Sequence, residues 1–232
     1  MKKILAITLV AMVAAASVHA DAVSISWKQY AGGVNDALDG YGVEAANNWN
    51  NSQAGLAWND SGLSSGAAST IDVAVTAPGG FITVTGGGIL DNTPMRTGIG
   101  VYAGGGSVTL SDINATFTTY DVIVYLGGYN AAGNGGAVSD GATTYYYSPL
   151  IPYSASLIQS TDTNSGDGLD GATYVRFNGL SADSTTISLS QIQGGLVLGG
   201  VQVVGTVIPE PATMGLFGAV GAGMLFIRRR YR

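Results

Sequence analysis

The feature that most constrains this chain is a series of short runs in which apolar and polar residues alternate. In one run, Ile71, Val73 and Val75 alternate with more polar neighbours. Successive side chains of a strand point to opposite faces, so the pattern predicts strands with one buried face. Residues 120–126 are almost continuously apolar after Asp121, which predicts a central strand covered on both faces. Nine strands are expected, at residues 23–28, 71–76, 81–85, 107–111, 120–126, 143–147, 174–177, 186–190 and 200–204.

Glycine clusters separate these runs. Triplets such as residues 86–88 and 104–106 permit the positive backbone angles that hairpin turns need. No segment carries a helical apolar stripe, and only residues 34–46 could hold a helical turn. We therefore expect an all-β protein with an antiparallel jelly-roll sandwich. The alternative, a parallel β-helix, would need a repeat of about 20 residues, which the sequence does not show.

The N-terminus has the pattern of a secretory signal peptide. Lys2 and Lys3 precede an apolar run over residues 4–16, and small residues precede a predicted cleavage between Ala20 and Asp21. A membrane anchor is the alternative, but the apolar run is short for a span. We predict a signal peptide at residues 1–20 and an extracytoplasmic domain at residues 21–207.

The C-terminal residues 208–232 contain three parts in a fixed order. A Pro-Glu-Pro motif at Pro209, Glu210 and Pro211 is followed by an uncharged stretch, residues 212–227, and a basic tail, residues 228–232. The stretch is slightly short for a membrane helix, and Val207 and Ile208 or a thinned bilayer could compensate. The arginines predict a cytoplasmic tail and an external domain. The arginine cluster consists of Arg228, Arg229 and Arg230, with Arg232 at the end.

These three parts closely resemble the bacterial PEP-CTERM sorting signal. The resemblance implies that an exosortase, a membrane-embedded processing enzyme, recognises Pro209, Glu210 and Pro211 and removes the tail after export by the secretion machinery. The membrane helix would then be a transient anchor, and the host a Gram-negative bacterium with a polysaccharide matrix. A permanent single-pass anchor is the alternative interpretation.

The domain itself is similar to the ectodomains of uncharacterised PEP-CTERM proteins. The resemblance rests on residues 118–128, 174–180 and 199–204, and on Trp49-Asn50-Asn51. It implies a galactose-binding-like β-sandwich and a location, but no activity. One departure is Gly199-Gly200, where Asn-Gly is expected before the last strand.

Charge and composition exclude several classes of function. Residues 21–207 carry three basic and fourteen acidic side chains, a formal charge of −11, so nucleic acid is not an expected partner. This region has neither histidine nor cysteine, which excludes Ser-His-Asp and Cys-His catalysis and histidine-ligated zinc or iron. A carboxylate pair that includes Glu44 remains open.

Two candidate ligand sites remain, each with a simpler structural interpretation. Asp162, Asn164, Asp167 and Asp170 lie in a glycine-rich loop whose oxygens would suit calcium, the one cofactor considered, although the spacing is not that of an EF-hand. A solvated acidic loop is the favoured interpretation. The aromatic residues that could stack on sugar rings are Trp49, Trp58 and Tyr145, for which core packing is favoured.

The sequence therefore predicts an exported, non-enzymatic protein of the cell envelope or extracellular matrix that associates with exopolysaccharide. Its expected partners are the secretion machinery, an exosortase and, transiently, the membrane. The alternative function is a secreted glycan-degrading hydrolase that uses a carboxylate pair.

Overall fold

The computed structural model describes residues 20–27, 42–46, 49–52, 57–59, 61–76, 81–83, 97–128, 134–150 and 156–208. All of them belong to one compact unit, Ala20–Ile208. The Pro-Glu-Pro motif, residues 212–227, the arginine cluster and residues 1–19 lie outside the described residues. Within the described ranges there is no helix, and so none long and apolar enough to cross a membrane.

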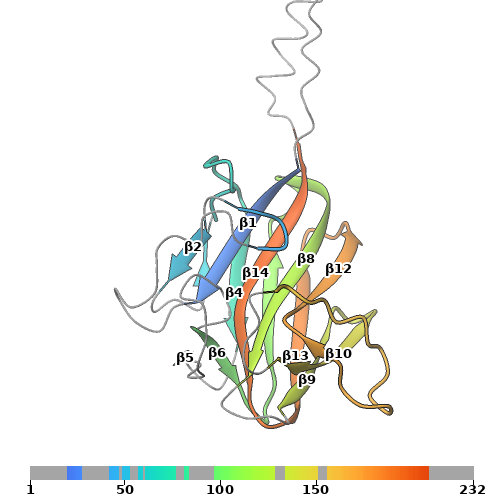
Figure 1. The fold of residues 1–232 in the computed structure, drawn as a ribbon. Coiled ribbons are helices and arrows are strands. Elements are labelled where there is room, and N and C mark those ends of the chain that lie inside the picture. The colour runs from blue at the N-terminus through green and yellow to red at the C-terminus, as the bar shows by residue number, and fades with distance from the viewer. Residues whose placement is uncertain are drawn as a thin grey trace, which may run out of the picture. The chain divides into compact units, whose positions relative to one another are not determined.

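The strands form two seven-stranded sheets (Figure 1). The first sheet has the order β12-β8-β14-β1-β2, with β6 paired to β14 and β5 to β6, and the second has the order β11-β10-β9-β13-β7-β4-β3. The strands are β1 Ala20–Trp27, β2 Trp49–Ser52, β3 Ala57–Trp58, β4 Asp72–Thr76, β5 Phe81–Thr83, β6 Thr97–Val101, β7 Gly106–Ser111, β8 Phe117–Gly128, β9 Gly135–Ser139, β10 Thr144–Pro149, β11 Gly171–Ala172, β12 Tyr174–Leu180, β13 Thr185–Gln193 and β14 Leu196–Val207.

Side chains from both sheets form one main core, as the alternation predicts. Val122 and Val124 of β8 contribute to it from the first sheet, and Val108 and Ile187 contribute from the second. The intervening residues of β8 point the other way, into a smaller apolar cluster of Ala22, Ala46, Trp49, Ile123, Tyr125 and Val204. The prediction that residues 120–126 form a strand buried on both faces is therefore confirmed.

The all-β class is confirmed, whereas the jelly-roll and galactose-binding-like identity stays a prediction. The sheets are not purely antiparallel, because β1 pairs with β2 and β10 with β11 in parallel. A parallel pair needs a long crossover, and residues 28–48 and 150–170 provide enough chain for one. Residues 42–45 form a turn, and residues 34–41 of the predicted helical segment are outside the described residues.

All nine predicted strands are present, but five others were missed. The missed strands are β2, β3, β6, β9 and β11. Two of them are rich in glycine, which lacks the side chain on which an alternation pattern depends. In β6, a Cβ on Gly98 would lie 2.2 Å from the Leu198 carbonyl oxygen, so the close approach of β6 to β14 requires glycine.

Candidate functional site

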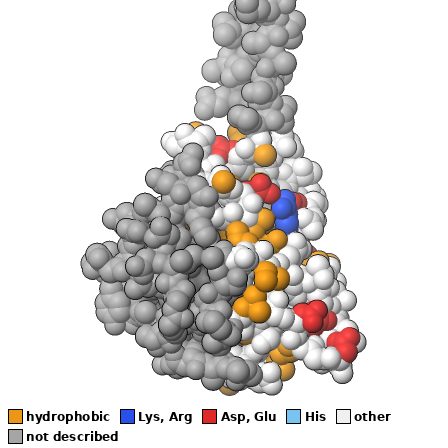
Figure 2. All heavy atoms as spheres, viewed as in Figure 1, with side chains coloured by type: hydrophobic (Ala, Val, Ile, Leu, Met, Phe, Trp, Pro, Cys, Tyr) orange, Lys and Arg blue, Asp and Glu red, His pale blue; other side chains and the backbone are white. Residues whose placement is uncertain are grey.

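A cluster of charged side chains lies on the outer face of the first sheet, over β8 and β12. Asp121 and Arg176 point outward because their neighbours along each strand point into the main core. Arg176 is paired in register with Ile123, so Asp121 is its diagonal neighbour on the same face. Figure 2 shows basic and acidic side chains side by side on this face.

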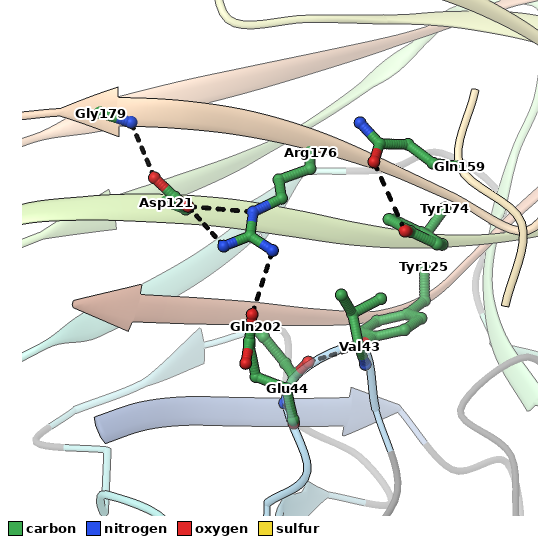
Figure 3. A network of polar contacts seen from close by, with 9 residues as sticks. All are labelled: Val43, Glu44, Asp121, Tyr125, Gln159, Tyr174, Arg176, Gly179 and Gln202. Carbon is green, nitrogen blue, oxygen red and sulfur yellow. Dashed lines mark hydrogen bonds and ion pairs between the residues drawn. The ribbon is translucent and has the colours of Figure 1, made fainter. Parts of the chain in front are cut away.

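The Arg176 guanidinium bonds two carboxylates (Figure 3). Its Nε and Nη2 donate to Asp121 Oδ2 at 2.9 and 2.6 Å, and its Nη1 donates to Glu44 Oε1 at 3.0 Å. The other oxygen of Asp121 accepts the Gly179 backbone N–H at 2.7 Å. The side chains of Arg176, Asp121 and Glu44 are 25%, 22% and 45% exposed, so this charge cluster is reachable from solvent.

The two carboxylates keep Arg176 charged. Burial by itself lowers the pKa of a guanidinium, but the hydrogen bonds and attraction of Asp121, followed by those of Glu44, outweigh it and raise the pKa of Arg176 above its usual value. Counting one guanidinium and two carboxylates, the cluster of Arg176, Asp121 and Glu44 has a formal charge of −1.

Hydrogen bonds from buried polar side chains hold the segment that carries Glu44 in place. Gln202 of β14 is fully buried, and its Nε2 donates to Ser24 Oγ and to the Glu44 carbonyl oxygen, both at 2.9 Å. Tyr125 donates its hydroxyl hydrogen to Gln202 Oε1 and accepts the Val43 N–H at 2.7 Å. These bonds involve only backbone atoms of Val43 and Glu44. They therefore do not occupy the Glu44 side chain, which faces outward toward Arg176.

The charge cluster opens into a hollow of about 260 Å³. Its lining combines carboxylate oxygens, guanidinium N–H groups and threonine hydroxyls, which is a mixture of acceptors and donors. The lining residues are Ala20, Glu44, Thr119, Tyr120, Asp121, Arg176, Gly179, Val204, Gly205 and Thr206.

A larger open hollow of about 800 Å³ lies near the loop before β8. Its acidic residues are Asp72, Asp112 and Asp183. Asp183 Oδ1 accepts the Asn114 N–H at 2.9 Å, so one of these carboxylates is part of the local turn structure. Among the described residues, no group of three or more acidic side chains is arranged to hold a metal ion.

Two of the predicted sugar-stacking residues serve in packing, and the third is not described. The Trp49 ring is 6% exposed and contacts the Tyr125 ring, with centroids 5.8 Å apart. Tyr145 packs against the main core and contacts Phe177 at 5.4 Å between ring centroids. Trp58 lies in β3, but its side chain is outside the described part of the structure. Sugar binding by these residues stays a prediction.

The predicted calcium loop forms consecutive side-chain turns. Asp162 Oδ1 accepts the Asn164 N–H at 2.7 Å, and Asn164 Oδ1 accepts the Gly166 N–H at 3.0 Å. Asp167 and Asp170 are exposed, and their side chains form no hydrogen bond with the described residues. This geometry explains the Asp and Asn residues as turn formers, and calcium binding stays a prediction.

Both ends of the described chain lie together. Ala20 pairs with Thr206, so the predicted cleavage position before Asp21 is beside the end of β14. Asp21 Oδ1 accepts the N–H groups of Ala22 and Ser65 at 2.8 and 3.2 Å and the Ser64 hydroxyl. Burial acts to raise the pKa of Asp21, but these hydrogen bonds outweigh it and lower the pKa below its usual range.

Sequence analysis identified Glu44 only as one member of an unspecified carboxylate pair. It did not identify Asp121, Arg176 or Gln202 as residues of the site. One signal was present: Arg176 is an outward-facing cation between apolar neighbours in a predicted strand of an acidic domain. Its acidic partners could not be read from the sequence, because Glu44 is 132 residues away.

Comparison with known proteins gives one match. Residues 207–230 match the family model described as the PEP-CTERM protein-sorting motif. No curated protein and no solved structure is significantly similar to the chain.

Proposed function

We propose that this chain, a PEP-CTERM protein by its sorting motif at residues 207–230, is a non-enzymatic component of the cell surface or extracellular matrix of a Gram-negative bacterium. The motif indicates an exported protein that an exosortase sorts. In the proposed function, the β-sandwich is the part that is delivered, and it associates with extracellular polysaccharide.

The observation that carries this proposal is the order of the parts. The compact unit closes with β14 and ends at Ile208, and the sorting motif occupies residues 207–230. A self-contained domain followed by a sorting motif is the arrangement expected of a cargo protein whose tail is removed. The absence of cysteine and the single histidine at His19, within the predicted signal peptide, support a role that needs neither Cys-His nor Ser-His-Asp catalysis.

The polar hollow at Arg176 is the proposed polysaccharide site. Glu44 is 45% exposed and bonds Arg176 through Oε1, so its second oxygen can accept a hydroxyl hydrogen. Arg176 uses one N–H of each Nη in the described bonds, which leaves one donor on each for a sugar oxygen. Because the charge cluster is net negative, we propose a neutral rather than an acidic polysaccharide.

The chain has only two glutamates, and they allow a matched test of this function. Glu210→Gln changes the sorting motif, and Glu44→Gln changes the hollow. We expect Glu210→Gln to be retained in the membrane of a host that carries the exosortase, with normal polysaccharide binding. We expect Glu44→Gln to be released normally but to bind host polysaccharide roughly tenfold more weakly, as for a lost hydrogen bond to a charged group.

Fractionation of the host and pull-down with host polysaccharide measure the two effects. Normal release of Glu210→Gln would refute the sorting part, and normal binding by Glu44→Gln would refute the polysaccharide site. The Glu44 variant should fold, because its carbonyl oxygen, rather than its side chain, bonds Gln202.

A glycan-degrading hydrolase is the second candidate, favoured by the presence of two carboxylates in one hollow. Against it, the Arg176 guanidinium bonds both Glu44 and Asp121 and so lies between them, where a glycosidic oxygen would have to sit. Release of sugar from host polysaccharide that is lost in Asp121→Asn or Glu44→Gln would favour this candidate. Binding without turnover would favour the non-enzymatic function.

A further inference from the structure

The last strand of the domain is paired on both sides nearly to its end. In the domain that starts at Asp21, Gly205 pairs with Asp21 of β1 and with Tyr120 of β8, and Val207 pairs with Phe117 of β8. The next residue, Ile208, donates its N–H to the Thr116 carbonyl oxygen at 2.9 Å. Val207 also packs against the main core. The backbone of the sandwich is therefore fixed through Ile208.

The sorting motif begins without a linker. Its match starts at Val207, so its first two residues are part of the folded sandwich, and Pro209 follows directly. Proline has no N–H, so Pro209 cannot donate a further hydrogen bond to the ladder. Val207 and Ile208 also cannot lengthen the predicted membrane helix while the sheet is intact, which corrects that expectation from the sequence.

A hydrogen-bonded central strand is a poor protease substrate. Peptide bonds within the ladder become accessible only when the strand end opens, and cleavage then follows the population of the open form. An enzyme that acts at the Pro-Glu-Pro motif must bind chain on both sides of the bond that it breaks. On the domain side, that chain is the end of β14.

We propose that the folded end of β14 sets both the position and the rate of processing; this inference rests on the proposed function. The exosortase breaks a peptide bond C-terminal to Ile208, so the released domain keeps all of β14. Water supplies the hydroxyl of the new C-terminal carboxylate, and the amine of the departing tail takes the proton. The rate is limited by opening of the last pairs of β14, because the motif match begins at Val207, within that strand.

The test is a flexible spacer in the full-length precursor. Ten Gly and Ser residues are inserted between Ile208 and Pro209, and the control carries the same spacer in the exposed turn between Gly141 and Ala142. Release in the exosortase-bearing host is followed by pulse-chase, and the C-terminus of the wild-type product is read by mass spectrometry. We expect release of the first variant to be on the order of tenfold faster than wild type, and the control to be unchanged.

Equal or slower release of the first variant, or a wild-type product that ends before Ile208, would overturn the inference. The outcome is separable from that of the proposed function. If Glu210→Gln is retained but the spacer has no effect, the sorting function stands and the inference fails. If Glu210→Gln is released like wild type, the sorting function itself fails.

Discussion

At the scale of single residues, Tyr147 stands out because its hydroxyl is buried in the main core without a hydrogen bond to any described residue. Burial raises the pKa of Tyr147 far above its usual value. Removing an unpaired buried polar group is neutral or stabilising. We therefore expect Tyr147→Phe to leave the free energy of unfolding unchanged or to raise it by up to about 1 kcal/mol.

Tyr120 is a matched control for this substitution. Its hydroxyl donates to the Ala182 carbonyl oxygen at 2.8 Å and also bonds Thr185. Tyr120→Phe should therefore lower the free energy of unfolding by about 1 kcal/mol. Urea unfolding measures both variants, and an equal loss for Tyr147→Phe would contradict the interpretation of its hydroxyl.

Asp21 should make the domain sensitive to acid. Its pKa is lowered in the folded state, so its contribution to stability is fully present above the ordinary aspartate pKa of about 4 and is lost as the pH falls through the folded-state pKa. Since this side chain is only partly buried, solvent weakens its interactions, and we expect Asp21→Asn to cost only about 0.5 kcal/mol at neutral pH. The difference from wild type in urea unfolding should be constant above about pH 5 and vanish well below pH 4. A difference that does not change with pH would contradict this role.

At the scale of single elements, β6 depends on glycine where it meets β14. A methyl group on Gly98 would overlap the Leu198 carbonyl oxygen, which is backbone and cannot rotate away. We expect Gly98→Ala to lower the free energy of unfolding by about 1 to 3 kcal/mol. Gly166→Ala is the control, since the added group would meet only the Asn164 side chain, at 3.2 Å. Similar melting temperatures for the two variants would refute this account of β6.

The loop from Asp162 to Asp170 allows a direct test of calcium binding. If it bound calcium only in the folded state, millimolar calcium would raise the melting temperature by mass action. Asp162 and Asn164 accept backbone N–H groups through Oδ1, so if the loop is only a set of turns, the melting temperature is the same in calcium and in chelator. A rise of several degrees that Asp167→Asn abolishes would establish the calcium site instead.

The elements that could be predicted from the sequence are those whose side chains alternate in the final packing. β4, β7 and β13 show this pattern, with buried residues at every second position over most of their length. β9 was missed because it begins with two glycines, and a Cβ on Gly136 would lie 2.5 Å from the Ser190 carbonyl oxygen. Close approach of two backbones leaves no periodic signal in the sequence.

The sequence predicted the chemical character of the candidate site but not which residues meet to form it. The acidic charge, the lack of histidine in residues 21–207 and the open option of a carboxylate pair with Glu44 came from composition. The meeting of Glu44 with Arg176 depends on Gln202 and Tyr125, which hold residues 43 and 44 over the sheet. Such long-range contacts follow from topology, which alternation does not specify. The same limit explains why the sequence favoured packing over sugar binding for Trp49 without deciding between them.

At the scale of the whole molecule, the first and last strands of the domain are neighbours. β1 pairs with β14 along nearly its whole length, from Ala20 with Thr206 to Ser26 with Gly200. The first sheet therefore cannot be completed until the chain has been made and exported through residue 207. Completion of the fold then coincides with exposure of the sorting motif, which matches residues 207–230.

The central claim is that the tail is a sorting signal read by an exosortase and not a permanent anchor. The most direct measurement compares the wild-type protein in two otherwise identical hosts, one with and one without the exosortase, by pulse-chase and membrane fractionation. We predict release of the domain in the first host and a full-length, membrane-retained precursor in the second. Equal release in both hosts, or retention of the full-length chain in both, would contradict the account.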